Sequence, residues 1–258
     1  SPDEQKPALF LERSFGWALG CCRKGASHIE QQIPCQDAFA IKVDTVSGSP
    51  CIIVAVADGH GDKAHDLSQY GSELAVEWAV KELCSFYEHF CFGEQGSLSA
   101  FKNSFKTDFS RRFLHKWTEK VIEDALNRTE AVLSLEVEQR AKMRQEVPIR
   151  YGTTLLIAMI IPSLFLLGQI GDGDILRMDS EGNAESIFQK DQTLVGSATH
   201  SLCSPLADKL FQTAILERSP ETQYLVMATD GLSNSFSEEG FSQFVKSLLE
   251  RIQEFGLE

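Results

Sequence analysis

The chain has 258 residues, of which 37 are acidic and 24 are basic, so its formal net charge is −13 at pH 7. Such an acidic surface repels phosphate backbones, and we therefore expect cations rather than nucleic acid as partners. The longest apolar run, residues 155–161, is far shorter than the roughly 20 residues that cross a bilayer, so no membrane span is expected. The seven cysteines form no CxxC pair, which favours reduced thiols in the cytoplasm.

No internal repeat or Pro/Ser-rich linker interrupts the chain, so one domain is expected over residues 1–258. Strand patterns, either alternating or continuously apolar, occur at residues 37–43, 51–57, 153–161, 164–170 and 175–178. Helical patterns occur around residues 74–83, within 105–145, and at 241–255 behind a predicted N-cap at Ser237. The short connections after residue 161 predict an antiparallel meander, and the separation of strands from helices predicts an α+β fold.

Three apolar strands run directly into an Asp-Gly pair, at Asp58, Asp172 and Asp230. Glycine lets the backbone turn sharply beside a carboxylate at the edge of a sheet, and neighbouring strands would bring the three carboxylates together. Clustered carboxylates repel one another and lose hydration, so they persist by taking up protons or by binding a cation. Oxygen ligands without His or Cys favour hard ions, so the pattern predicts Mg²⁺ or Mn²⁺ in preference to Zn²⁺.

His60 lies two residues after the first of these aspartates and has glycine on either side. An imidazole beside a metal-binding carboxylate can donate a proton to a leaving group, so His60 is a candidate general acid. No P-loop, HExxH or GxSxG motif occurs, which disfavours nucleotide, zinc-protease and serine-hydrolase sites. Asp172 and Asp174 come close to the Asp-x-Asp pattern of aspartate-nucleophile phosphatases but lack its last residue, and this chemistry stays open as a less favoured alternative.

Five short motifs follow one another along the chain: Cys35-Gln-Asp37, Val56-Ala-Asp-Gly-His-Gly61, Tyr151-Gly-Thr-Thr154, Ile170-Gly-Asp-Gly-Asp174 and Ala228-Thr-Asp-Gly-Leu-Ser-Asn234. In this order they resemble the metal-dependent type 2C protein Ser/Thr phosphatases, the PPM class. The residues of the motifs are more similar to those of its bacterial subgroup. The resemblance implies a four-layer αββα sandwich, in which two antiparallel β-sheets are flanked by helices. It also implies a metal centre with two or three Mg²⁺ or Mn²⁺ ions at one end of the sandwich.

The resemblance also implies roles for individual residues. Asp58 matches the carboxylate that bridges two metals, and Gly59 matches the residue whose backbone carbonyl binds one of them. Asp172 matches the aspartate associated with an additional, weaker metal, whereas Asp174 stands where the family has arginine and its role is open. His60 matches the family's general acid. The implied metal-binding residues are Asp37, Asp58, Gly59, Asp172, Asp174 and Asp230.

Two departures from the family pattern bear on activity. Gln32 occupies the position of a phosphate-binding arginine, so the substrate-binding residue is unknown, with Arg23 and His28 as weak candidates. Gln36 likewise replaces an acid that often precedes the first aspartate. No aspartate follows residue 230, although the family completes its metal site with a later one, and we therefore expect the chain to lack its C-terminal strand or strands.

The expected function is that of a protein phosphatase which hydrolyses phosphoserine and phosphothreonine through a metal-activated water. Its expected partners are phosphorylated proteins and a cognate Ser/Thr kinase in signal transduction, and a monomer is expected. The alternative from another class is a non-catalytic phosphatase-like module that binds phosphoproteins or regulators. That alternative is motivated by Gln32, by Gln36 and by the missing last aspartate.

Overall fold

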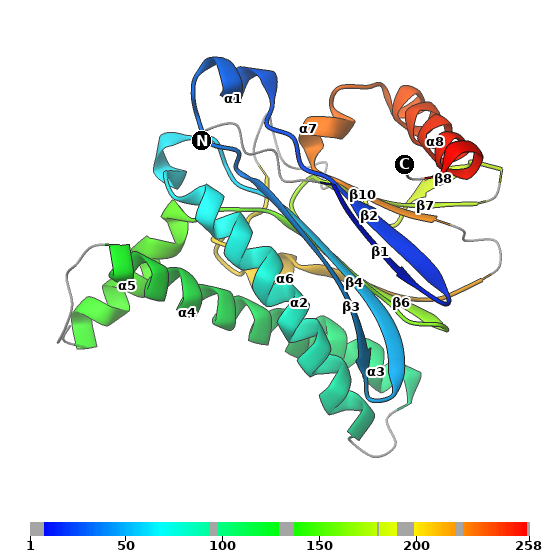
Figure 1. The fold of residues 1–258 in the computed structure, drawn as a ribbon. Helices are drawn as coiled ribbons and strands as arrows, with labels where there is room; N and C mark the ends of the chain where they lie inside the picture. Colours follow the sequence, from blue (N-terminus) through cyan, green and yellow to red (C-terminus); the bar gives the residue numbers. More distant parts are fainter. Residues whose placement is uncertain are drawn as a thin grey trace.

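The computed structural model describes residues 8–92, 97–128, 137–179, 181–189, 199–219 and 224–256. Its elements are arranged in four layers, with helices on one side, two antiparallel sheets in the middle and a long helix on the other side (Figure 1). This arrangement confirms the predicted α+β class and the αββα sandwich.

The larger sheet is antiparallel throughout, and Asp58 is the last residue of one of its strands. Its five strands, in spatial order, are β3 (Asp37–Val46), β4 (Ser49–Asp58), β5 (Leu155–Ile160), β6 (Leu164–Ile170) and β9 (Gln212–Glu217). β5 is a continuous apolar run because both of its faces are covered. Leu155 and Ile157 face the helices, while Leu156 and Ala158 face the second sheet.

The smaller sheet has three strands in the order β10 (Tyr224–Ala228), β7 (Asp174–Met178) and β8 (Ala184–Ser186). The prediction that residues 175–178 continue the meander of β5 and β6 was wrong, because β7 pairs with β10 and β8 instead. The chain leaves the larger sheet at Gly171, whose φ of +110° is a conformation that few residues other than glycine adopt. A separate hairpin, which the sequence patterns did not indicate, is formed by β1 (Leu9–Arg13) and β2 (Gly16–Gly20).

Most of the helical residues lie on the outer face of the larger sheet, where α2 and α4 cross it. The helices and helical turns are α1 (Ala26–Glu30), η1 (Lys63–His65), α2 (Ser68–Phe92), α3 (Leu98–Ser104), η2 (Phe105–Phe109), α4 (Ser110–Arg128), α5 (Val137–Arg150), α6 (Ala207–Leu210), α7 (Asp230–Ser233) and α8 (Glu238–Phe255). Of the predicted helical stretch 105–145, the structure describes η2, α4 and the first part of α5, and residues 129–136 lie outside the described residues. The predicted N-cap of the last helix is confirmed, because the Ser237 hydroxyl accepts a hydrogen bond from the backbone N–H of Gly240. None of the described helices combines the length and the apolar character that crossing a bilayer requires.

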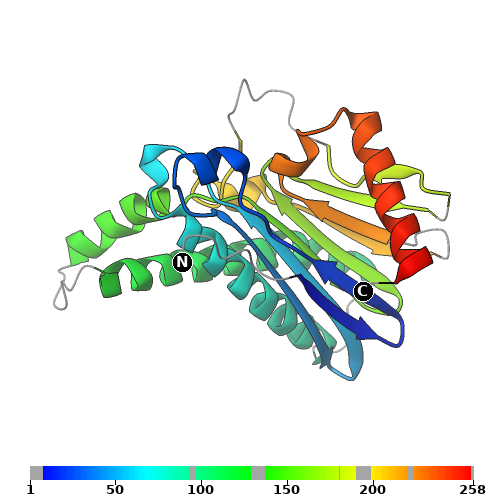
Figure 2. The same ribbon diagram turned by 45° about the horizontal axis from the view of Figure 1, so that its top comes forward.

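Three apolar clusters hold together the layers of helices and sheets that Figure 2 shows from a second direction. The first fills the space between the larger sheet and the helices and contains the fully buried Phe105, Phe113 and Trp117. The second lies between the sheets and includes Leu156, Leu167 and Ile175. The third joins the smaller sheet to α8 through Leu176, Met178, Phe241 and Val245. Both sheets are thus fixed relative to each other, which positions the residues at their shared edge.

Candidate active site and metal centre

Two of the predicted site residues lie opposite each other on neighbouring strands. β3 begins at Asp37, β4 ends at Asp58, and the two residues are register partners. Cross-strand partners have their Cβ atoms about 4.5–5.5 Å apart, so the two side chains interact directly. Their side chains are hydrogen-bonded to each other. The last pair of this hairpin therefore presents two carboxyl groups at one edge of the larger sheet.

Two further aspartates reach the same place from the other sheet. Asp172 lies in the connection between β6 and β7, where the chain passes from the larger to the smaller sheet. Asp230 begins α7, directly after β10, and its carboxylate accepts a hydrogen bond from Asn234 Nδ2 at 3.1 Å. Both act electrostatically on Asp58, and Asp230 is also hydrogen-bonded to it. The site is therefore the junction at which the two sheets bring their acidic ends together.

This junction disfavours negative charge. Burial, followed by the charge of Asp37, raises the pKa of Asp58 to about 9, and Asp230 and Asp172 add to the shift. Burial and the charge of Asp230 raise the pKa of Asp37 to about 6, although its hydrogen bond to Asp58 opposes the increase. Without a counter-charge, part of the cluster is protonated at neutral pH.

The donor set fits a hard divalent cation. Asp37 Oδ1 is buried and has no hydrogen-bond partner within the described residues, so it has a lone pair available for a ligand. The converging groups are carboxylates, which are the ligands that Mg²⁺ and Mn²⁺ prefer. A bound cation would offset the repulsion that raises these pKa values. The residues present are therefore compatible with the predicted Mg²⁺ or Mn²⁺ centre.

The turn after Asp58 is held by backbone and hydroxyl contacts from the Tyr151-Gly-Thr-Thr segment. The Asp58 carbonyl accepts hydrogen bonds from Thr154 N at 2.8 Å and Thr153 Oγ1 at 2.9 Å, and Thr154 Oγ1 accepts one from Asp58 N. At Gly59 a Cβ atom would lie 2.8–2.9 Å from the backbone of Ser68 and Gln36. Glycine is required here because the backbones approach too closely for any side chain.

His60 lies at this turn beside a second histidine. Its ring centroid is 4.8 Å from that of His65, and both rings pack against Gly152, where a Cβ would be 2.4 Å from His65 Nδ1. Burial, followed by the charge of His65, lowers the pKa of His60 to about 4. The His60 backbone carbonyl accepts hydrogen bonds from Gln36 Nε2 at 3.0 Å and from Ser68 Oγ at 2.9 Å. The imidazole is thus fixed in place and is neutral at pH 7.

A family model for protein phosphatase 2C matches residues 24–257. The chain belongs to the protein phosphatase 2C family. The match spans most of the chain and both sheets, so it covers the carboxylate junction, the Gly59 turn and His60 together. The predicted family is confirmed, and the protein is a protein phosphatase, of the hydrolase class.

Two solved structures with a TM-score of 0.50 agree with this fold. A bacterial serine phosphatase variant has a TM-score of 0.50 at 13% identity, with 94% of this chain and 84% of that chain covered. A sex-determining protein of C. elegans has a TM-score of 0.50 at 16% identity, with 83% and 52% covered. The serine/threonine phosphatase Stp1 of Staphylococcus aureus has a TM-score of 0.47 at 13% identity, with 95% and 88% covered. A comparison with curated protein sequences gave no match.

The remaining predicted residues of this phosphatase lie on other segments of the chain. Asp174 is the first residue of β7 and pairs with Ala228 of β10, so it lies on the smaller sheet two residues beyond Asp172. Arg23 is exposed in the segment between β2 and α1, and His28 is half-buried within α1. Gln32 has a positive φ of 56° just after α1. The substrate-binding roles of Arg23 and His28 and the metal-binding role of Asp174 stay predictions.

Sequence patterns missed three residues that support the site. Gln36 Nε2 also donates to Ser68 Oγ at 2.7 Å, so these two side chains and the His60 carbonyl form one hydrogen-bonded group. His65 packs on the catalytic candidate His60 and contacts the Ile149 carbonyl through Nδ1. The second histidine of Gly-His60-Gly-Asp-Lys-Ala-His65 was the available signal. Ser68 offered none, because a serine at a helix start is ordinary capping chemistry.

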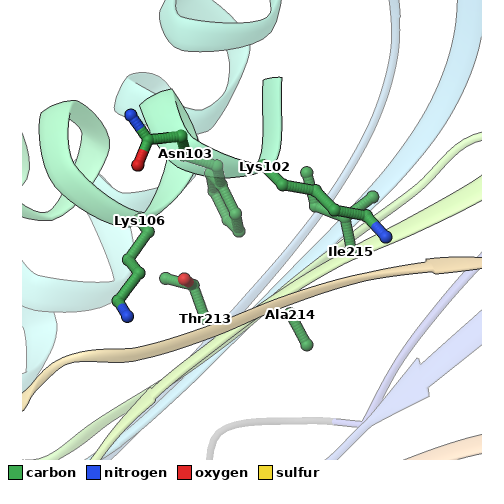
Figure 3. Close-up of a pocket in the computed structure, with 7 residues that line it drawn as sticks. Lys102, Asn103, Lys106, Thr213, Ala214 and Ile215 are labelled. Carbon is green, nitrogen blue, oxygen red and sulfur yellow. The ribbon is translucent and has the colours of Figure 1, made fainter. Parts of the chain in front are cut away.

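A hollow of about 430 Å³ lies elsewhere, between the α3–η2 helix and the edge strand β9 (Figure 3). Lys102 and Lys106 extend from the helix over Thr213 and Ile215, as Figure 3 shows. The residues that line it include no carboxylate, histidine or cysteine. It therefore lacks the donors of a metal centre.

Proposed function

We propose that this chain hydrolyses phosphoserine and phosphothreonine in proteins, in a metal-dependent reaction. The observation that carries the proposal is the convergence of Asp37, Asp58, Asp172 and Asp230 from two sheets, with pKa values raised by burial and mutual repulsion. A junction that disfavours its own charge is destabilising unless a cation is bound there. Membership of the phosphatase 2C family supports the same function.

The cofactor proposed is Mg²⁺ or Mn²⁺, in two or three copies. The residues that would hold it are the four converging aspartates, the Gly59 carbonyl and, at the periphery, Asp174. Bound divalent ions lower the pKa of a coordinated water to supply a nucleophile and neutralise charge on phosphate oxygens. Asp58 is proposed as the central ligand, since Asp37, Asp172 and Asp230 all act on its carboxyl group and raise its pKa.

His60 is proposed as the general acid that protonates the departing serine or threonine oxygen. A general acid must carry a proton at the working pH, and the free imidazole is neutral at pH 7 because burial lowers its pKa to about 4. A phosphate dianion beside the ring would raise this pKa, since an opposite charge stabilises the imidazolium. The hydrogen bonds from Gln36 and Ser68 to the His60 carbonyl hold the backbone at this turn, and packing against His65 positions the ring.

The test is phosphate release from a phosphothreonine peptide with Mn²⁺, with and without chelator. Asp58→Asn is expected to lower kcat by at least about 10²-fold, because it removes a carboxylate from the proposed metal centre. The matched control is Asp44→Asn on the same hairpin, where the carboxylate is paired with Lys42 at 2.5 Å on the surface. Activity that survives both chelation and Asp58→Asn would contradict the proposal.

The same assay separates the alternatives. An acid-stable phosphoaspartate trapped during turnover would favour the aspartate-nucleophile chemistry of Asp172 and Asp174. Tight phosphopeptide binding without turnover in Mn²⁺ would favour the non-catalytic module. Phosphorylated proteins are the proposed partners, and a cognate kinase, a monomeric state and a cytoplasmic location stay predictions.

A further inference from the structure

Two cysteines meet beside the aspartate junction although they are 13 residues apart in the sequence. The Sγ atoms of Cys22 and Cys35 are separated by 3.5 Å, and they lie 3.7 Å and 3.9 Å from the backbone carbonyl oxygen of Asp37. A thiol sulfur from each cysteine and a carboxylate oxygen of Asp37 lie within 4.8 Å of one another. All three residues are half-buried. The fold therefore gathers two thiols and one carboxylate at a single point.

The spacing of these donors suits a soft or borderline divalent cation. Two sulfurs bound to one tetrahedral Zn²⁺, at Zn–S distances of about 2.3 Å, lie about 3.8 Å apart, close to the separation observed. A disulfide needs a much shorter sulfur–sulfur distance of about 2.05 Å. The Asp37 carboxylate would supply a third ligand, and its buried Oδ1 has no hydrogen-bond partner within the described residues. Water would occupy the fourth position, as in zinc sites with three protein ligands.

We propose that Cys22, Cys35 and Asp37 bind Zn²⁺ at a site adjacent to the hard-ion centre and sharing Asp37 with it. Thiolate ligands select Zn²⁺ over Mg²⁺ and Mn²⁺, and the Irving–Williams order adds to that preference. This sharing of Asp37 has a consequence for activity, and that consequence rests on the proposed function. Zn²⁺ that engages the Asp37 carboxylate withdraws a ligand from the Mg²⁺ or Mn²⁺ centre, so Zn²⁺ inhibits the phosphatase.

The direct test uses Co²⁺ as a spectroscopic probe of the reduced 258-residue chain. Wild type is expected to show a thiolate-to-cobalt charge-transfer band, together with the intense visible bands of tetrahedral Co²⁺, and Zn²⁺ should displace both. Cys22→Ser and Cys35→Ser should each abolish the band and weaken Zn²⁺ binding by more than about 100-fold, beyond the range typical of outer-shell changes. The matched control is Cys21→Ser, which removes the exposed neighbouring thiol and should leave the band unchanged.

Two results would overturn the site: no thiolate band in wild type, or a band that persists in both Cys22→Ser and Cys35→Ser. Loss of the band in Cys21→Ser would overturn the assignment of its ligands. Circular dichroism of each variant checks that the fold is intact, and two independent thiol variants keep the test valid if one of them fails to fold. Excess Mg²⁺ should not displace the cobalt band, because thiolates bind Mg²⁺ poorly.

The inhibition is measured separately as the ratio of Mn²⁺-supported phosphate release with and without Zn²⁺, so that each variant is its own reference. Cys22→Ser should raise the Zn²⁺ concentration needed for half inhibition by at least about 10-fold, whereas Cys21→Ser should not change it. An unchanged inhibition in Cys22→Ser would overturn the sharing of Asp37. If the chain releases no phosphate under any condition, the proposed function fails, and the cobalt spectra still decide the thiol site.

Discussion

β4 passes through two regions that follow opposite physical rules. Along its middle, Ile53 and Ala55 are fully buried against the helices, in a cluster that contains only apolar side chains. At its end, Asp58 is packed among other aspartates, where burial raises its pKa to about 9. The first region stabilises the fold through apolar burial, and the second opposes it through repulsion and lost hydration. Apolar burial along the same strands therefore offsets the repulsion among the aspartates at the acidic junction.

The largest expected effect on stability comes from the apolar region. Trp117 is fully buried, and its Nε1 donates a hydrogen bond to the Gly71 carbonyl at 3.1 Å. Trp117→Ala should therefore lower the free energy of unfolding by about 3–5 kcal/mol, through a cavity and the loss of this hydrogen bond. Urea denaturation measures the change. Phe244→Ala on the exposed face of α8 is the control and should cost less than about 1 kcal/mol; equal losses would contradict the comparison.

The next effect concerns the turn that joins the two regions. Gly59→Ala should lower both stability, by about 1–3 kcal/mol, and phosphatase activity, by at least about 10-fold, because the added methyl group forces apart the backbones of Ser68 and Gln36. Gly61→Ala, two residues away, is the matched control. A Cβ there would meet only Gln36 Oε1 at 3.6 Å, which is an ordinary contact. Thermal melts and initial rates of both variants decide whether the Gly59 contact matters.

At the acidic junction the sign of the effect on stability reverses. Asp58→Asn should increase the free energy of unfolding of the metal-free protein by about 1 kcal/mol, because it removes a carboxyl group that must take up a proton when the chain folds and buries it beside Asp37. For a chain of this size that corresponds to roughly 2–4 °C in Tm. Calorimetry in chelator measures the shift, and the same variant loses activity. Asp44→Asn, which breaks a surface pair with Lys42, should change stability by less than about 0.5 kcal/mol. A lower Tm for metal-free Asp58→Asn would show that the junction is not repulsive.

The stability of the metal-free protein should also depend on pH. The folded-state pKa of Asp58 is about 9 and that of Asp37 is about 6, both above the unfolded value of 3.8, so the folded state binds more protons in this range. Stability should therefore fall as pH rises from 6 to 9, with a slope of at most about 1.4 kcal/mol per pH unit for each proton. His60 acts in the opposite sense below pH 6.5, since its folded-state pKa is lowered to about 4 and stability is lost on acidification.

Urea denaturation at several pH values in chelator measures this dependence. Asp58→Asn should flatten the decline between pH 6 and 9, and Asp44→Asn should leave it unchanged. A wild-type stability that rises with pH in this range would contradict the raised pKa values. Addition of Mn²⁺ should reverse the wild-type slope, because deprotonated carboxylates bind the ion more tightly.

Much of the fold was accessible from local patterns, and the reasons differ between elements. The apolar stripe of α8 and its Ser237 cap identify an amphipathic helix, and the structure confirms both. The route of the chain after β6 was not accessible, because Gly171 and Ile175 are equally compatible with a meander and with a crossing to another sheet. The hairpin of β1 and β2 was missed because its two short segments, LFLER and GWALG, show no clear alternation of apolar and polar residue types.

The candidate site divides in the same way. The repeated Asp-Gly endings identify Asp58, Asp172 and Asp230 as candidates, since an aspartate and glycine after an apolar run place a carboxylate at a sheet edge. Their metal-binding roles and the role of His60 stay predictions. His65 and the Cys22–Cys35 pair depend on contacts between distant segments, and spacing along the chain carries no signal of those contacts.

The sequence by itself determined which residues are apolar on one face, which strands end in aspartate, and how strongly acidic the phosphatase is, because these properties depend on neighbours along the chain. The tertiary structure decided that β7 leaves the larger sheet and that aspartates from two sheets converge. It also decided that burial raises the pKa values of Asp37 and Asp58. Burial and proximity are properties of the packed layers, so a charge of −13 spread along a chain becomes a specific acidic centre only once the sheets are stacked.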